Sequence, residues 1–134
     1  MEVNHPTKHA ILLLLFAASH PTRLVKKSEV AQFYGVHENS LTKVVYALQK
    51  SNYIETKRGR NGGLKLAKSP IDINMGEILN LFENVGGSKN KKISSDDQFI
   101  VELFLGRAYT MFSEFLHSIT LKNILDKREK ILSE

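Results

Sequence analysis

Cysteine is absent from the 134-residue chain. Its absence excludes disulfide bonds, thiolate zinc sites, all-cysteine iron–sulfur clusters and a cysteine nucleophile. Long apolar runs are also lacking: the longest, at 10–18, has nine residues, whereas a membrane-spanning helix needs about 20. The basic start and cleavage site of a secretory signal are missing too. We therefore expect a soluble, cytoplasmic protein with no membrane partner.

Acidic residues are few in the first half of the chain. Residues 1–70 carry 11 Lys and Arg but only 4 Asp and Glu, whereas residues 71–134 carry 8 basic and 10 acidic residues. A basic segment beside a mildly acidic one is typical of a polyanion-binding module joined to a part with another task.

Apolar spacing predicts a mainly α chain with one small β-hairpin. Leu41, Val44, Val45 and Leu48 recur at helical spacing, and short strand-like runs flank a turn rich in Gly and Asn. Ser28 is expected to cap one helix, Gly35 to end it, and Asn52 to end the next. Asn74 and Glu77 are expected to form a capping-box-like pair at the start of a later helix. The first expected helix has Pro6 in its first turn and the apolar stretch 10–18, the second lies at 28–34, and the third carries the apolar residues at 41–48. Further helices are expected at 74–82, at about 96–117 and from near 120 onward, with hairpin strands at 53–56 and 64–66 and a loop at 86–98.

The order of these elements predicts a winged helix-turn-helix followed by a long C-terminal dimerisation helix. Two short helices meet at Gly35, and a hairpin follows whose tip holds Lys57, Arg58 and Arg60 without any acid between residues 56 and 65. Arginine beside glycine suits the narrow minor groove of DNA, where the backbone must approach closely. We expect a DNA-binding domain at 1–70 and, at 71–134, a linker helix, a loop and dimerisation helices.

Several segments resemble the Rrf-two family of bacterial winged-helix transcriptional regulators. They are Ser-Glu-Val-Ala (28–31) with Tyr-Gly-Val (34–36), Leu-Gln-Lys-Ser-Asn-Tyr-Ile (48–54), Arg-Gly-Arg-Asn-Gly-Gly-Leu-Lys-Leu (58–66) and Ile-Asp-Ile-Asn-Met-Gly-Glu-Ile-Leu (71–79), and a match near residues 118–125 extends the likeness over nearly the whole chain. The resemblance implies a homodimer whose two winged helices bind a palindromic operator in double-stranded DNA, most simply as a repressor.

The same resemblance assigns site residues. The expected base-reading residues are His37, Asn39, Ser40, Thr42 and Lys43, and Arg58 corresponds to the minor-groove arginine. The polar and basic character of the hairpin adds Gly59, Arg60 and Asn61 to the expected DNA-binding set. The candidate phosphate contacts are Thr7, Lys8, Ser28 and Lys57.

The chain departs from the cluster-binding members of that family. Those members carry three cysteines in the loop before the long helix, whereas residues 86–98 have none here, and Lys8 stands where some of them carry an aspartate ligand. An ammonium group cannot replace that carboxylate as a ligand. The pair His5 and His9 has no acidic partner nearby and fits surface residues better than a metal site. We expect no cofactor and no metal.

The long helix is rich in aromatic residues, Phe99, Phe104, Phe112 and Phe115 among them, which are too many for the core of one small domain. A dimer seam is the first interpretation, and a hydrophobic effector pocket at that seam is the second. Two alternatives to a cluster-free DNA-binding regulator stay open: a protein-interaction regulator whose winged helix binds a partner protein, and a repressor that senses a small ligand at the seam. No phosphate-binding loop or catalytic constellation is present, so an enzyme is not expected.

Overall fold

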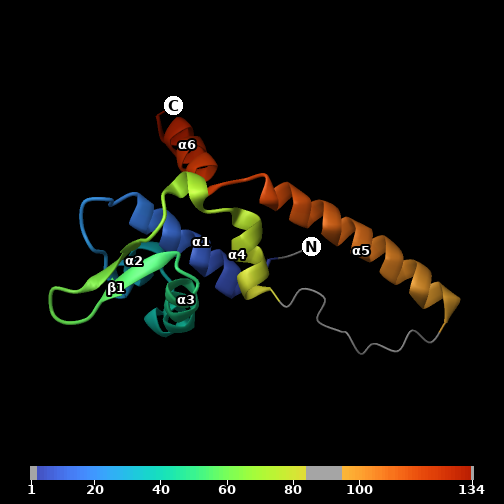
Figure 1. Cartoon of the computed structure of the whole chain (residues 1–134), viewed down its shortest axis with the longest axis horizontal. Helices are drawn as coiled ribbons and strands as arrows, with labels where there is room; N and C mark the ends of the chain where they lie inside the picture. Colours follow the sequence, from blue (N-terminus) through green and yellow to red (C-terminus); the bar gives the residue numbers. More distant parts are fainter. Residues whose placement is uncertain (1–2, 84–94, 134) are drawn as a thin grey trace.

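The computed structural model describes residues 3–83 and 95–133. Within these ranges six α-helices and a two-stranded hairpin form a body from which one long helix projects (Figure 1). This arrangement confirms the predicted class, mainly α with a small β-hairpin. No helix in the described ranges combines the length and the apolar character needed to cross a membrane.

Helix α1 (His5–Ala18) runs through the centre of the body. The Asn4 side chain caps it by accepting a hydrogen bond from the Thr7 backbone N–H at 3.0 Å, and Pro6 occupies the first turn, where a missing N–H costs nothing. Leu13 and Leu14 are fully buried. A helix that is apolar on most of its surface must be enclosed, and the other helices and the hairpin surround this one.

Helices α2 (Lys27–Tyr34) and α3 (Glu38–Lys50) form the expected helix-turn-helix. Gly35 adopts the left-handed conformation at φ +68°, and Asn52 does so after α3 at φ +64°, which confirms both expected helix ends. The expected Ser28 cap is wrong. The N-cap residue is Lys26, two positions before Ser28, and the Glu29 carboxylate accepts a hydrogen bond from the Lys26 backbone N–H at 3.0 Å.

Strands β1 (Ile54–Lys57) and β2 (Gly63–Leu66) pair antiparallel, with Ile54 opposite Leu66 and Lys57 opposite Gly63. The intervening residues form the wing tip. Gly62 is buried there, and a Cβ atom at this position would overlap the carbonyl oxygen of Lys57. The hairpin therefore closes tightly because residue 62 has no side chain.

The second half of the chain begins with a short 3₁₀ helix, η1 (Pro70–Asp72), and helix α4 (Met75–Phe82). The Asn74 side chain caps α4 as expected, whereas Glu77 does not reach back to complete a capping box. Helices α5 (Asp96–His117) and α6 (Leu121–Leu132) match the expected long and final helices, with N-caps Ser95 and Thr120. Most of the loop expected before the long helix lies outside the described residues.

One hydrophobic core joins the two halves of the chain. Ile73, Met75, Ile78 and Leu121 are buried in the same cluster as the apolar residues of α1. Burying a side chain of this size stabilises a fold by about 1.5–3 kcal/mol. The boundary at residue 70 therefore remains a prediction about division of function, because the packing is continuous across it.

A hydrogen bond between the halves makes stability sensitive to alkaline pH. Tyr53 is buried at the start of the hairpin, and its hydroxyl donates to Glu77 Oε2 at 2.9 Å. Burial, reinforced by that hydrogen bond and by the carboxylate charge, raises the pKa of Tyr53 to about 12.

We expect the Tyr53–Glu77 contribution to be complete below pH 10 and to be lost as the pH rises from 10 through 12, because the folded state disfavours the phenolate more than the unfolded state does. Urea unfolding of the parent at pH 9 and pH 11 should show a larger fall in free energy of unfolding than the same measurement on Tyr53→Phe. Equal falls in the two proteins would contradict this role for Tyr53.

Candidate nucleic-acid interface

The expected base-reading residues all lie on the exposed N-terminal part of α3. His37 is the N-cap residue of this helix, Asn39 and Ser40 lie in its first turn, and Thr42 and Lys43 follow in the second turn. The opposite face of α3 is buried through Leu41, Val44 and Leu48. The apolar side thus holds the helix on the body while its polar side faces outward, the arrangement that a major-groove helix needs.

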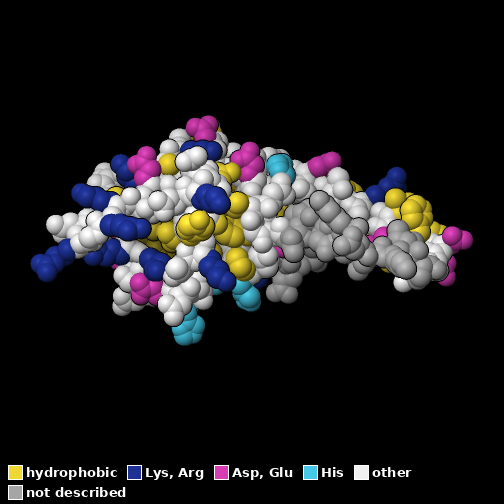
Figure 2. Space-filling model, turned by 60° about the horizontal axis from the view of Figure 1, so that its bottom comes forward, with side chains coloured by type: hydrophobic (Ala, Val, Ile, Leu, Met, Phe, Trp, Pro, Cys, Tyr) yellow, Lys and Arg dark blue, Asp and Glu magenta, His cyan; other side chains and the backbone are white. Residues whose placement is uncertain are grey.

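The basic wing tip projects from the same body. Arg58, Gly59, Arg60 and Asn61 are all exposed, and Gly59 has the left-handed φ of +105° that permits a sharp turn. Figure 2 shows Lys and Arg side chains gathered over the end of the molecule that holds the hairpin, away from the projecting end of α5. Positive potential is therefore concentrated on one end of the molecule.

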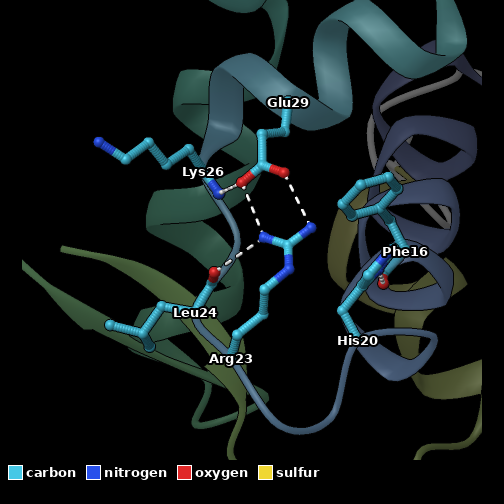
Figure 3. Close-up of polar contacts among 6 residues, drawn as sticks. All are labelled: Phe16, His20, Arg23, Leu24, Lys26 and Glu29. Atoms are coloured by element: carbon cyan, nitrogen blue, oxygen red, sulfur yellow. Dashed lines mark hydrogen bonds and ion pairs between the residues drawn. The ribbon is translucent and has the colours of Figure 1, made fainter. Parts of the chain in front are cut away.

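An ion pair braces the segment that leads into α2. The Arg23 guanidinium donates to both carboxylate oxygens of Glu29, each at 3.0 Å, and also to the Leu24 carbonyl at 3.1 Å (Figure 3). The hydrogen bonds from Arg23 hold the pKa of the Glu29 carboxyl below its usual range. Because the same carboxylate accepts the Lys26 backbone N–H, the pair holds residues 23–29 in one conformation.

Two adjacent lysines at the start of α2 contact the wing tip and α3. The Lys26 ammonium donates to the Arg60 carbonyl in the wing tip at 2.9 Å, and the Lys27 ammonium donates to Thr42 Oγ1 on α3 at 3.0 Å. The backbones of Val25 and Leu64 also exchange two hydrogen bonds, at 2.9 and 2.8 Å. The start of α2 is therefore bonded to both the wing and α3.

Sequence reasoning missed Arg23, Lys26 and Lys27. The Lys26–Arg60 contact joins residues 34 positions apart, so no local pattern could reveal it. The Lys27 contact leaves the Thr42 hydroxyl hydrogen available as a donor, because the lysine uses only an oxygen lone pair.

The candidate phosphate contacts differ in their surroundings. Ser28, Lys57 and Lys8 are exposed, on α2, β1 and α1 respectively. Thr7 is only 1% exposed, and its hydroxyl donates to Asn4 Oδ1 at 2.8 Å. An interior hydroxyl cannot reach a phosphate. The expectation that Thr7 contacts a phosphate is therefore corrected.

A family model described as an iron-dependent transcriptional regulator, Rrf2, matches residues 3–127. An HTH-type transcriptional regulator NsrR of Bacillus licheniformis is 34% identical, with 98% of this chain and 96% of the relative covered, and NsrR of Bacillus subtilis is 31% identical over 98% and 95%. Among solved structures, IscR of T. potens matches with a TM-score of 0.80 at 25% identity, covering 98% of this chain and 90% of that one. CymR of B. subtilis shares the fold, with a TM-score of 0.77 at 20% identity over 95% and 98%.

The donor set of this chain does not fit an iron–sulfur cluster, although the family is described as iron-dependent. The sequence holds no cysteine, so thiolate ligands are unavailable. Within residues 3–83 and 95–133, no group of three or more His, Asp and Glu side chains is placed to hold a metal ion. Partial burial of His9 lowers the pKa of its imidazole, and the nearby charge of His5 lowers it further.

The exposed polar start of α3, the basic wing and these similarities agree on a DNA-binding regulator rather than an enzyme. The chain belongs to the Rrf2 family of transcriptional regulators, and it has the winged-helix fold of that family.

Proposed function

We propose that this protein is a homodimeric repressor that binds a palindromic operator without an iron–sulfur cluster. The observation that carries this proposal is the joint exposure of the polar start of α3 and the basic wing tip, which the start of α2 bonds to each other. A rigid pair of this kind contacts both grooves of a duplex in one encounter.

The N-terminal part of α3 enters the major groove in this proposal. Asn39 is suited to a bidentate contact with adenine and Lys43 to guanine, while Ser40, Thr42 and His37 donate to base edges or phosphates. Their exposure on the first two turns supports the assignment, since the first turns of a recognition helix lie closest to the bases.

The wing contacts the adjacent minor groove. Arg58 inserts where the groove is narrow and the potential most negative, and Gly59 allows the backbone to approach. Arg60, Asn61 and Lys57 contact phosphates beside it, together with Ser28 and Lys8 from the helical body. Such phosphate contacts fix the register of the protein without reading sequence.

The projecting helix α5 supplies the dimer interface. No residue of α5 is buried, and Phe104, Met111 and Phe115 are 64%, 70% and 65% exposed. Tyr109, Phe112 and Leu116 are half-buried at the end of α5 beside α4, so the exposed apolar residues are left for another partner. A second copy of the same helix offers matching apolar residues, and pairing of the two places two winged helices on one duplex.

More than one side of α5 must be covered. Phe99, Ile100 and Val101 are consecutive and all exposed. Successive residues of a helix point about 100° apart, so these three side chains face different directions. One flat helix-to-helix contact cannot enclose all three, which indicates that the partner subunit surrounds this half of α5 with more than one element.

Selection of bound duplexes from a random library, with purified protein and no added metal, tests the proposal. Enrichment of one palindrome whose half-sites lie about one or two helical turns apart is the expected result. Salt-sensitive binding without enrichment would contradict sequence-specific recognition by the metal-free protein, and salt-insensitive capture would indicate that DNA is not the ligand.

Arg58→Ala should weaken binding to the selected operator by about 1–3 kcal/mol and relax the preference for A·T pairs at the minor-groove positions. Lys130→Ala is the matched control. It removes one positive charge at an exposed residue of α6 and should bind like the parent. The measurement is a titration of labelled duplexes at fixed salt concentration. Unchanged affinity and preference in Arg58→Ala would show that the wing does not enter the groove as proposed.

Lys26→Met should weaken binding by acting through the wing, because it removes the bond to the Arg60 carbonyl. Its effect should largely disappear in an Arg58→Ala background, whereas Lys27→Met, which acts on Thr42, should weaken both backgrounds equally. Affinities of the parent, the three single variants and the two double variants supply the comparison. Additive effects, with a salt dependence reduced by about one phosphate contact, would instead make Lys26 a direct DNA contact.

Phe104→Glu should produce a folded monomer, because the substituted side chain is 64% exposed in the single chain and lies in the proposed seam. Ile71→Glu adds the same charge at an isoleucine that is 63% exposed outside α5 and should remain dimeric. Sedimentation velocity measures the mass, and circular dichroism checks helix content. A Phe104→Glu protein that still sediments as a dimer would place the interface elsewhere.

A further inference from the structure

The C-terminal end of helix α5 is attached to the body through two segments. Residues 73–76 lead into α4, and residues 117–121 run from the last residue of α5 to the first residue of α6. We call these two segments the α4–α5 joint. The Met75 N–H donates to the Ile119 carbonyl at 2.9 Å, and the Leu121 N–H donates to the Ile73 carbonyl at 2.8 Å. Asn74 and Thr120 face each other in an isolated antiparallel bridge. The backbone at the end of α5 is thus paired with the backbone that starts α4.

Both polar atoms of the Asn74 side chain form hydrogen bonds in this joint. Its oxygen accepts from the Gly76 and Glu77 N–H groups at 2.8 and 3.2 Å, which caps α4. Its amide nitrogen donates to the His117 carbonyl at 2.6 Å, which is one of the unpaired carbonyls at the end of α5. One side chain therefore provides hydrogen-bond partners both for backbone N–H groups in the first turn of α4 and for a backbone carbonyl in the last turn of α5.

The His117 ring packs directly on Gly76. A Cβ atom at residue 76 would overlap three atoms of the ring, and Gly76 itself is buried. One hydrogen bond orients this exposed ring, because its Nδ1 lies 2.8 Å from the Ser113 carbonyl one turn earlier in the same helix. The absence of a side chain at residue 76 thus sets how closely α5 approaches α4.

A small rotation at this joint has a large effect at the other end of α5. The helix has 22 residues, so at a rise of about 1.5 Å per residue it is about 33 Å long. A rotation of about 10° displaces its far end by about 6 Å, which is close to two base-pair steps of DNA. Residues 96–108 of α5 are all exposed, so the half of the helix that lies away from the joint has no side chain buried against the body that could correct such a rotation.

We propose that the α4–α5 joint determines the spacing between the two half-sites that the dimer recognises, with His117 and Asn74 as positioning residues. The inference rests on the proposed function, because it requires a dimer joined through α5 and bound to a palindrome. Half-site sequence and half-site spacing are then controlled by separate parts of the chain: α3 and the wing set the first, and the joint sets the second.

The test uses the full-length protein and duplexes that carry the selected half-sites with one or two base pairs removed from or added to the central spacer. The parent should prefer one spacing sharply. His117→Ala should reduce the affinity ratio between the best and the next-best spacing at least threefold, while single-base substitutions within a half-site keep their parental effect. His5→Ala, at an exposed histidine of α1 outside the joint, is the matched control and should keep the parental ratio.

A second measurement needs no DNA. Gly76→Ala should lower the midpoint of thermal unfolding, and combining it with His117→Ala should lower the midpoint by less than the sum of the two single shifts, because removing the ring makes room for the added methyl group. Additive shifts would overturn the packing of His117 on Gly76 and, with it, the positioning role.

The outcomes for the two proposals are separable. If the parent protein binds a single half-site as tightly as the palindrome, the proposed dimeric function is wrong. The proposed role of the joint is then wrong as well, because it requires the dimer. A parent with a preferred spacing that His117→Ala fully preserves overturns the joint alone and leaves the proposed function intact.

Discussion

The structure depends on the burial of helix α1. Its apolar residues at positions 10–18 contact α2, α3, β2, α4 and α6, so one helix supplies a surface on which the remaining elements of the body are assembled. Ile73, Met75, Ile78 and Leu121 belong to the same core. The winged helix and the start of the second half are consequently one packed unit, and a displacement of α4 cannot leave the DNA-binding elements unaffected.

On this core, the start of α2 is connected to the wing and to α3 by polar contacts at the surface. The Arg23–Glu29 pair is exposed, and an isolated exposed pair contributes little to stability. Its value lies in geometry, because it orders the segment from which Lys26 and Lys27 extend to the wing and to α3. Preorganised elements lose less conformational entropy on binding, and this favours tight recognition by a small protein.

In the second half of the chain, by contrast, the long helix is mostly exposed. The described part of α5 exposes many large apolar side chains and is fastened firmly only at its C-terminal end. Exposed apolar surface of this extent is typical of a subunit interface. A family model described as iron-dependent matches this chain, yet the chain has no cysteine and therefore no thiolate ligand for an iron–sulfur cluster.

Features that depend on neighbouring residues could be predicted from the amino-acid sequence. Helical spacing predicted α5 at Asp96–His117, Gly35 and Asn52 marked two helix ends, and Asn74 marked a helix start, because each of these follows from local backbone preference. Contacts between residues far apart in the chain became visible only in the folded structure. Burial of Thr7, the bond from Lys26 to the wing and the packing of His117 on Gly76 arise only when the core brings distant segments together, and residue type and spacing carry no record of them.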